Sequence, residues 1–160
     1  MIKKIVTLSI LLSALYLSGC ASVPLASKEE DNSQKEFKQP SNDKSGIYIY
    51  RKANLGMALK KTIKVNGKEI CETADSTYFY LTVAPGQHLL QTESEIGYND
   101  AELNTVGGEN YYIKQWLRPG LIVGGAHLSI MDKEQAQKDI QSLKLIDLSR
   151  CNMANKNVSQ

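Results

Sequence analysis

The chain has 160 residues, 42% of them apolar and 22% charged, which is enough for one compact domain with a real core. Lys3 and Lys4 account for the formal net charge of +2, so the chain without residues 1–19 carries 17 basic and 17 acidic side chains. This balance argues against a nucleic-acid-binding protein, which needs a basic face for phosphate. It equally argues against a domain held on anionic lipid by charge alone.

Residues 1–19 have the layout of a lipoprotein signal peptide. Lys3 and Lys4 precede a charge-free apolar run over residues 5–17, which is shorter than the ~20 residues that a transmembrane helix needs. The residues that match a lipobox are Leu17, Ser18, Gly19 and Cys20. The small residues let the backbone enter the signal peptidase, and the cysteine thiol takes up lipid. The alternatives are an ordinary secretory signal with a chance cysteine and an uncleaved anchor.

The residue after the cysteine bears on location. Two or three acyl chains on Cys20 would make membrane attachment effectively permanent. An Asp after the cysteine commonly retains such proteins in the inner membrane, whereas this chain has Ala21 there. We therefore expect a protein of the bacterial cell envelope, anchored in the outer membrane and facing the periplasm.

Residues 20–44 are predicted to be the lipidated N-terminus followed by a flexible linker. The stretch 27–44 is polar, and Phe37 is its only large apolar residue. Such a stretch buries too little surface to offset its ordering entropy. The alternative is a segment that folds on a partner.

A β-rich domain is predicted over residues 45–151, because apolar residues alternate with polar or aromatic ones from Gly46 onward. Asn66-Gly67 is a strong hairpin signal, and Pro85-Gly86 fits a type II turn. The expected strands cover residues 47–51, 62–65, 68–72, 77–83, 88–93, 111–117, 128–131 and 145–148.

One helix is predicted, with Asp132 as its N-cap and with Ala136, Ile140 and Leu143 on one face. Residues 152–160 are predicted to be a frayed polar tail. These elements indicate a mainly β fold, a small antiparallel β-sandwich of transthyretin-like or immunoglobulin-like type with one short C-terminal helix.

Cys71 and Cys151 remain once Cys20 is assigned to lipid. Two thiols in an exported protein favour one disulfide. Two buried free thiols are the alternative. A zinc site with His88 and His127 is disfavoured, because no pair of potential ligands has metal-binding spacing.

We find no motif for nucleophilic, metal-dependent or phosphate chemistry, so we expect no enzyme, no cofactor and no metal. The glycine-rich stretch 119–125 favours a connection over a ligand loop. The acidic residues of 93–102 favour a solvated cluster over a calcium loop.

Aromatic side chains are the remaining candidates for a binding surface, because alternation places some of them on the sheet face opposite the core. These candidates are Tyr48, Tyr50, Tyr78, Tyr80, Tyr112 and Trp116. The alternative is that both faces are covered, or that the hydroxyls simply reach water.

The ordered segments IYIYR, IKVNGKEI, TYFYLTVAPGQHLLQTESE and GENYYIKQW resemble an uncharacterised bacterial lipoprotein family, domain of unknown function 2846, over roughly residues 45–130. The VNGK hairpin followed by PGQH is also similar to PEGA-type surface β-domains. Both resemblances imply a small sandwich, and neither supplies catalytic residues.

These features predict a non-enzymatic envelope lipoprotein whose β-domain binds an envelope protein or glycan. The alternatives are an accessory subunit of a secretion, conjugation or stress-response assembly, and an enzyme with an unrecognised site.

Overall fold

The computed structural model describes residues 22–52, 58–120 and 124–151. The predicted signal peptide, the lipobox with Cys20 and the predicted tail over 152–160 lie outside the described residues. No helix in the described part of the chain is long and apolar enough to cross a membrane.

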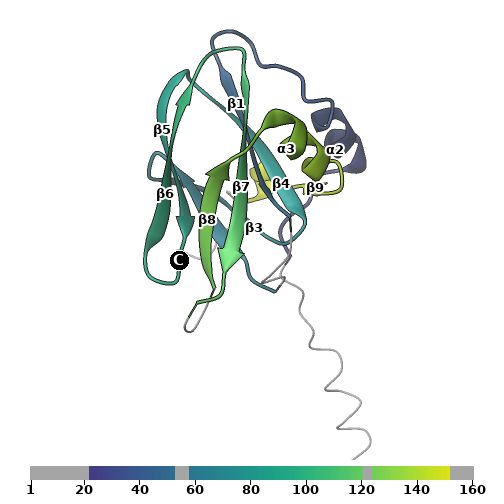
Figure 1. Ribbon diagram of the computed structural model, residues 1–160. Coiled ribbons are helices and arrows are strands. Elements are labelled where there is room, and N and C mark those ends of the chain that lie inside the picture. Colours follow the sequence, from purple (N-terminus) through teal and green to yellow (C-terminus); the bar gives the residue numbers. More distant parts are fainter. Residues whose placement is uncertain (1–21, 53–57, 121–123, 152–160) are drawn as a thin grey trace, which may run out of the picture.

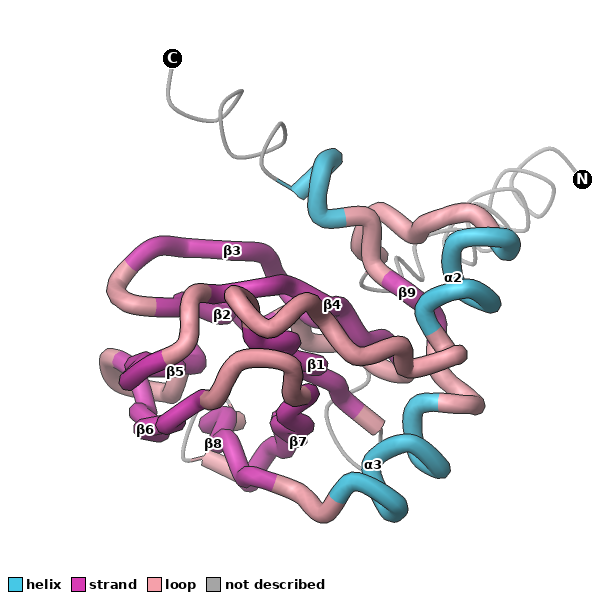
Figure 2. The backbone as a smooth tube through the Cα atoms, turned by 90° about the horizontal axis from the view of Figure 1, so that it is seen from above, coloured by secondary structure: helices cyan, strands magenta, loops and turns pink. Residues whose placement is uncertain are grey.

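Two β-sheets face one another (Figures 1 and 2). The five-stranded sheet has, in spatial order, β8 (Gly125–Ile130), β7 (Asn110–Arg118), β1 (Ser45–Arg51), β4 (Thr77–Val83) and β9 (Lys144–Leu145). The four-stranded sheet has the order β3 (Lys68–Thr73), β2 (Lys61–Val65), β5 (Gly86–Glu93) and β6 (Tyr98–Thr105). The predicted mainly β sandwich is confirmed. The five-stranded sheet is mixed, because β1 pairs with β7, and β4 with β9, in parallel.

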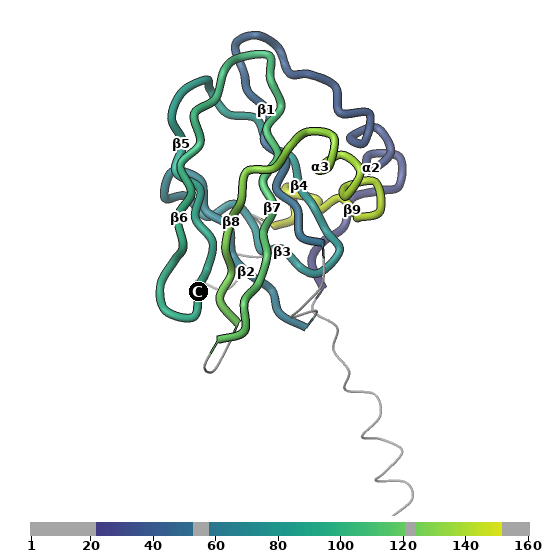
Figure 3. The backbone as a smooth tube through the Cα atoms, viewed as in Figure 1, coloured from purple at the N-terminus to yellow at the C-terminus, as the bar shows by residue number. Residues whose placement is uncertain are grey.

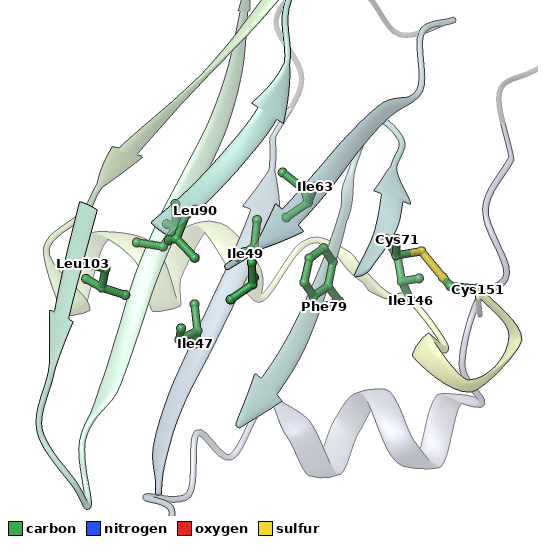
Figure 4. Packing of buried hydrophobic residues seen from close by; sticks show 11 residues of the cluster. Ile47, Ile49, Ile63, Cys71, Phe79, Leu90, Leu103, Ile146 and Cys151 are labelled. Atoms are coloured by element: carbon green, nitrogen blue, oxygen red, sulfur yellow. A yellow bond between two sulfur atoms is a disulfide. The ribbon is translucent and has the colours of Figure 1, made fainter. Parts of the chain in front are cut away.

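The main core lies between the sheets. Ile47 and Ile49 of β1 and Phe79 of β4 point toward Leu90 and the other apolar side chains of the four-stranded sheet (Figure 4). Every residue of β1 is buried, because the side chains that alternate with the two isoleucines are covered on the opposite face as well. A strand covered on both faces marks the centre of the fold.

The hairpin predicted at Asn66-Gly67 joins β2 to β3. Asn66 and Gly67 have φ values of 52° and 77°, the two positive angles that a type I′ turn requires. The strand β6 was not predicted: its inward residues Ala101 and Leu103 alternate with Asp100 and Glu102, whose charges obscured the pattern.

Two helices lie outside the five-stranded sheet, on the side away from the four-stranded sheet (Figure 2). The predicted C-terminal helix is α3 (Lys133–Ile140), and the Asp132 side chain caps it by accepting from the Glu134 and Gln135 amides. The second helix, α2 (Lys28–Gln34), falls in the predicted flexible linker. That prediction is wrong for the described residues, because the Ser27–Glu30 capping box starts a helix that packs on the domain.

The predicted disulfide is confirmed. It joins Cys71 of β3 to Cys151, with the two Cα atoms 5.4 Å apart (Figure 4). Residues 148–151 form a helical turn, so the strand predicted over 145–148 is wrong beyond Ile146. The disulfide therefore ties the C-terminal turn to the edge of the four-stranded sheet.

Candidate functional site

Four of the six aromatic residues predicted to form a binding surface are inside the protein. Tyr48, Tyr50 and Tyr78 have no exposed surface, and Tyr112 is 2% exposed. The prediction of a binding surface is wrong for these four, and the alternative of a covered face is correct for them. The sequence pattern placed the rings on the correct face of the sheet, but α2, α3 and Phe37 cover that face.

The N-terminal segment covers Tyr48 and Tyr78. The Phe37 ring lies 5.4 Å from the Tyr48 ring, and Gln34 Nε2 donates to the Tyr48 hydroxyl at 2.6 Å. The Tyr78 hydroxyl donates to Asp31 Oδ1 at 2.8 Å. Burial is the main reason why the pKa of Tyr48 and of Tyr78 is raised, so both hydroxyls stay protonated.

Helix α3 covers Tyr112 and Tyr50. Gln137 Nε2 donates to the Tyr112 hydroxyl at 2.8 Å, and the Tyr50 hydroxyl donates to Asp139 Oδ2 at 3.3 Å. Lys52 Nζ lies 2.8 Å from Asp139 Oδ1. Burial acts to raise the pKa of Asp139, but the hydrogen bond and charge of Lys52, together with the Lys114 charge and the Tyr50 hydrogen bond, outweigh it, so the pKa is lowered.

Residues 22–38, which we call the N-terminal strap, are also joined to the C-terminal part of the chain. Leu25 forms a β-bridge with Ile146, and the flanking bonds are Ala26 N to Leu145 O and Asp147 N to Pro24 O, both 2.9 Å. Figure 3 shows these purple and yellow segments lying side by side. The N-terminal strap is thus a structural part of the domain.

Trp116 is the predicted candidate that stays partly exposed beyond the helices. Its indole stacks on the His127 ring with centroids 4.8 Å apart, and its Nε1 donates to Ser129 Oγ at 3.0 Å. The Arg118 guanidinium lies 4.9 Å from the indole centroid. Burial and the nearby Arg118 charge lower the pKa of His127. We call these four residues, with Lys114 beside them, the Trp116 patch.

The Trp116 patch has the chemistry of a recognition surface. Lys114 and Arg118 make no ion pair with a described carboxylate, although Lys114 lies close enough to Asp139 to lower its pKa. A stacked guanidinium keeps its N–H edge available for a carboxylate or phosphate. An indole edge and an imidazole next to it add apolar and polar contact area.

Tyr80, the sixth candidate, is half-buried in a groove of about 350 Å³ beside α2 and β9. Glu30, Gln34 and Asp147 also line this groove. A second groove, of about 520 Å³, lies at the β2–β3 turn. There His88 Nδ1 is 3.0 Å from Asn66 Nδ2 and His88 Nε2 is 2.8 Å from Ala84 O, so this histidine braces the turn.

A layer of buried polar residues between the sheets was missed by sequence reasoning. Gln115 is fully buried; its Oε1 accepts from the Thr73 hydroxyl, and its Nε2 donates to Thr92 Oγ1 at 2.7 Å. Arg51 and Lys61 are 1% and 3% exposed. The signal for Arg51 was available, because alternation along IYIYR places it on the same face as the core isoleucines. The Gln115 bonds fix the two sheets against each other.

The side chains considered as metal ligands do not cluster in the part of the chain that the structure describes. No group of three His, Cys, Asp or Glu side chains is close enough there to hold an ion. His88 lies on β5 and His127 on β8, in different sheets. The described acidic residues of 93–102 lie on and around the β5–β6 hairpin, where Asp100 accepts from Gln91 at 3.0 Å.

The fold and these surfaces define a small β-sandwich domain whose aromatic outer face is largely covered by its own N-terminal strap and α3. The chain belongs to the family described as a protein of unknown function, DUF2846, whose model matches residues 41–126. It is also 43% identical, over 137 residues, to an uncharacterised protein of Haemophilus influenzae strain Rd. That match covers 86% of this chain and 82% of the relative.

Proposed function

We propose that this protein is a lipoprotein of the bacterial envelope, lipidated on Cys20, whose β-domain binds an envelope protein or glycan through the Trp116 patch without performing catalysis. The lipobox and the charge-free apolar run before it support the anchor. The Cys71–Cys151 disulfide supports an exported location, since such bonds persist in oxidising compartments.

The observation that carries the binding proposal is the Trp116 patch itself. Four tyrosines of this sheet face are buried under the N-terminal strap and α3, whereas Trp116 is partly exposed beside Arg118 and Lys114. Contacts of aromatic and arginine side chains dominate the binding energy of many interfaces.

Photocrosslinking in intact cells tests the binding proposal. A photoreactive phenylalanine analogue at position 116 should capture an envelope component, whereas the same analogue at Val106, which is 62% exposed on the β6–β7 connection, should not. Arg118→Ala in the position-116 protein should reduce the yield of the adduct. Equal adducts from positions 116 and 106, or none from either, would refute a binding site at the Trp116 patch.

The anchor is tested separately. Wild-type protein grown with labelled palmitate should carry the label and sediment with outer membranes, whereas Cys20→Ala should remain unlabelled. Label on the mature N-terminus of Cys20→Ala would refute lipidation at this cysteine. Label on the wild type in inner-membrane fractions would refute the outer-membrane location alone.

A further inference from the structure

The distance between Cys20 and the folded domain is short. The described chain begins at Ser22, and the neighbouring Val23 is already packed against the main core. Two residues of extended chain reach at most about 7 Å. The polar headgroup layer of one leaflet is itself about 5–7 Å thick, from the difference between the whole bilayer and its hydrocarbon core. A lipid on Cys20 therefore leaves no room for a spacer.

The start of the strap is also firmly attached to the domain at Leu25. Besides the bridge between Leu25 and Ile146, the Arg150 guanidinium donates to the Leu25 carbonyl and to Asp147 Oδ2, the latter at 2.7 Å. Cys151, next in the chain, is held to β3 by the disulfide. Residues 24–26 thus cannot swing away from the domain without breaking these bonds.

The surface at this end has the side chains that a headgroup layer accepts. Leu25 is an exposed apolar residue, with 37% of its surface accessible. Lys28 and Lys144 are exposed and line, together with Leu25 and Leu145, a hollow of about 200 Å³. Lysines beside an apolar floor can place their stems on it and their ammonium groups among lipid phosphates.

We infer that the domain sits directly on the bilayer that holds its lipid, with the surface formed by Leu25, Lys28, Lys144 and Arg150 facing the headgroups. This inference rests on the proposed lipidation of Cys20. In place of a domain at the end of a flexible linker, the protein then has a domain whose orientation toward the membrane is fixed. Leu25 and Lys28 near the start of the strap, and Arg150 of the C-terminal turn, are then membrane-facing.

The single tryptophan of the chain makes the orientation measurable. In a Trp116→Phe background, used only to remove the native signal, one tryptophan is introduced at Leu25 and, in a matched control, at Val106. The lipidated full-length proteins are placed in vesicles of phosphatidylethanolamine and phosphatidylglycerol, a fraction of which carries a headgroup nitroxide. The Leu25→Trp protein should lose most of its fluorescence to the nitroxide, and the Val106→Trp protein should keep it.

A spacer provides the second arm. Inserting about ten Gly-Ser residues between Ala21 and Ser22 adds ~17 Å of average reach and should remove the selective quenching of Leu25→Trp. Equal quenching at positions 25 and 106 would overturn the inference, as would quenching unaffected by the spacer. A Leu25→Trp protein shielded from aqueous iodide but not quenched by nitroxide would show a second copy of the chain on this surface, which also overturns the inference. The palmitate experiment detects failure of lipidation independently.

Discussion

The Asp31 carboxylate is the residue on which the N-terminal strap most depends, and replacing it should detach the strap. Its Oδ1 accepts from the Tyr78 hydroxyl at 2.8 Å and from the Leu145 amide at 3.2 Å, and its Oδ2 lies 2.7 Å from Lys35 Nζ. Asp31→Ala removes all three interactions and leaves the buried Tyr78 hydroxyl without this partner. Asp31→Asn keeps an acceptor for two of the donors and loses only the ion pair.

The magnitudes follow from the burial of these groups. A hydrogen bond to a charged group contributes about 1.5–3 kcal/mol, and an unsatisfied buried donor costs about 1–3 kcal/mol. The Lys35 pair adds no more than about 1 kcal/mol, because its partners are partly exposed. We therefore expect Asp31→Ala to destabilise the docked strap by about 3 kcal/mol and Asp31→Asn by about 1 kcal/mol.

Amide hydrogen exchange separates release of the strap from unfolding of the domain. The Ala26 and Asp147 amides hydrogen-bond across the strap, whereas the Ile49 amide lies in the centre of the fold. In Asp31→Ala, the two strap amides should exchange about a hundredfold faster, as ~3 kcal/mol requires at 1.4 kcal/mol per decade.

The matched control is Glu29→Ala, an exposed carboxylate in the first turn of the same helix, which should leave strap exchange nearly unchanged. If Asp31→Ala accelerates the Ala26 amide no more than Glu29→Ala does, then Asp31 does not hold the strap.

Three further outcomes are expected. Gln115→Leu should lower the free energy of unfolding in urea by about 1–3 kcal/mol, because the buried Thr73 and Thr92 hydroxyls each lose one of their two hydrogen-bond partners; a change below about 0.5 kcal/mol would contradict this role. Replacing Cys71 and Cys151 with serine opens a loop with a sequence separation of 80 residues and should cost about 4 kcal/mol; unchanged stability of the oxidised wild type on adding reductant would contradict it. The folded-state pKa of His127 is lowered. The contribution of this histidine to the stability of the fold is therefore fully present above the unfolded-state pKa, and it is lost as the pH falls through the folded-state pKa. His127→Gln should therefore weaken the loss of thermal stability between about pH 7 and pH 5, and identical pH profiles would refute it.

The strands of the five-stranded sheet could be predicted because two kinds of side chain alternate along them, as in a strand whose two faces have different environments. In β1, the isoleucines face the main core and the tyrosines face the helices, and the period-two pattern assigned both correctly. What covers the tyrosines could not be deduced from that pattern. The cover depends on hydrogen bonds from residues far away in sequence, such as Asp31 and Asp139.

The helix α2 was missed for a physical reason. It has no buried residue of its own, so it shows no apolar periodicity. The local signal that could have found it is the spacing of Ser27 and Glu30, an S-x-x-E capping box at the start of the charged stretch. The low apolar content of this segment indicated disorder, because a segment with few apolar residues can bury little apolar surface. The segment is instead held by polar contacts with buried tyrosines and by Phe37.

The disulfide between Cys71 and Cys151 also determines how a mechanical load would pass through the molecule. Tension between a lipid on Cys20 and a bound partner would enter at Ser22 and pull on the backbone bonds between the strap and residues 145–147. The C-terminal turn that holds Leu25 is covalently joined to β3, in the opposite sheet. The pull is therefore shared by both layers of the sandwich, and the edge strand β9, only two residues long, does not bear it alone.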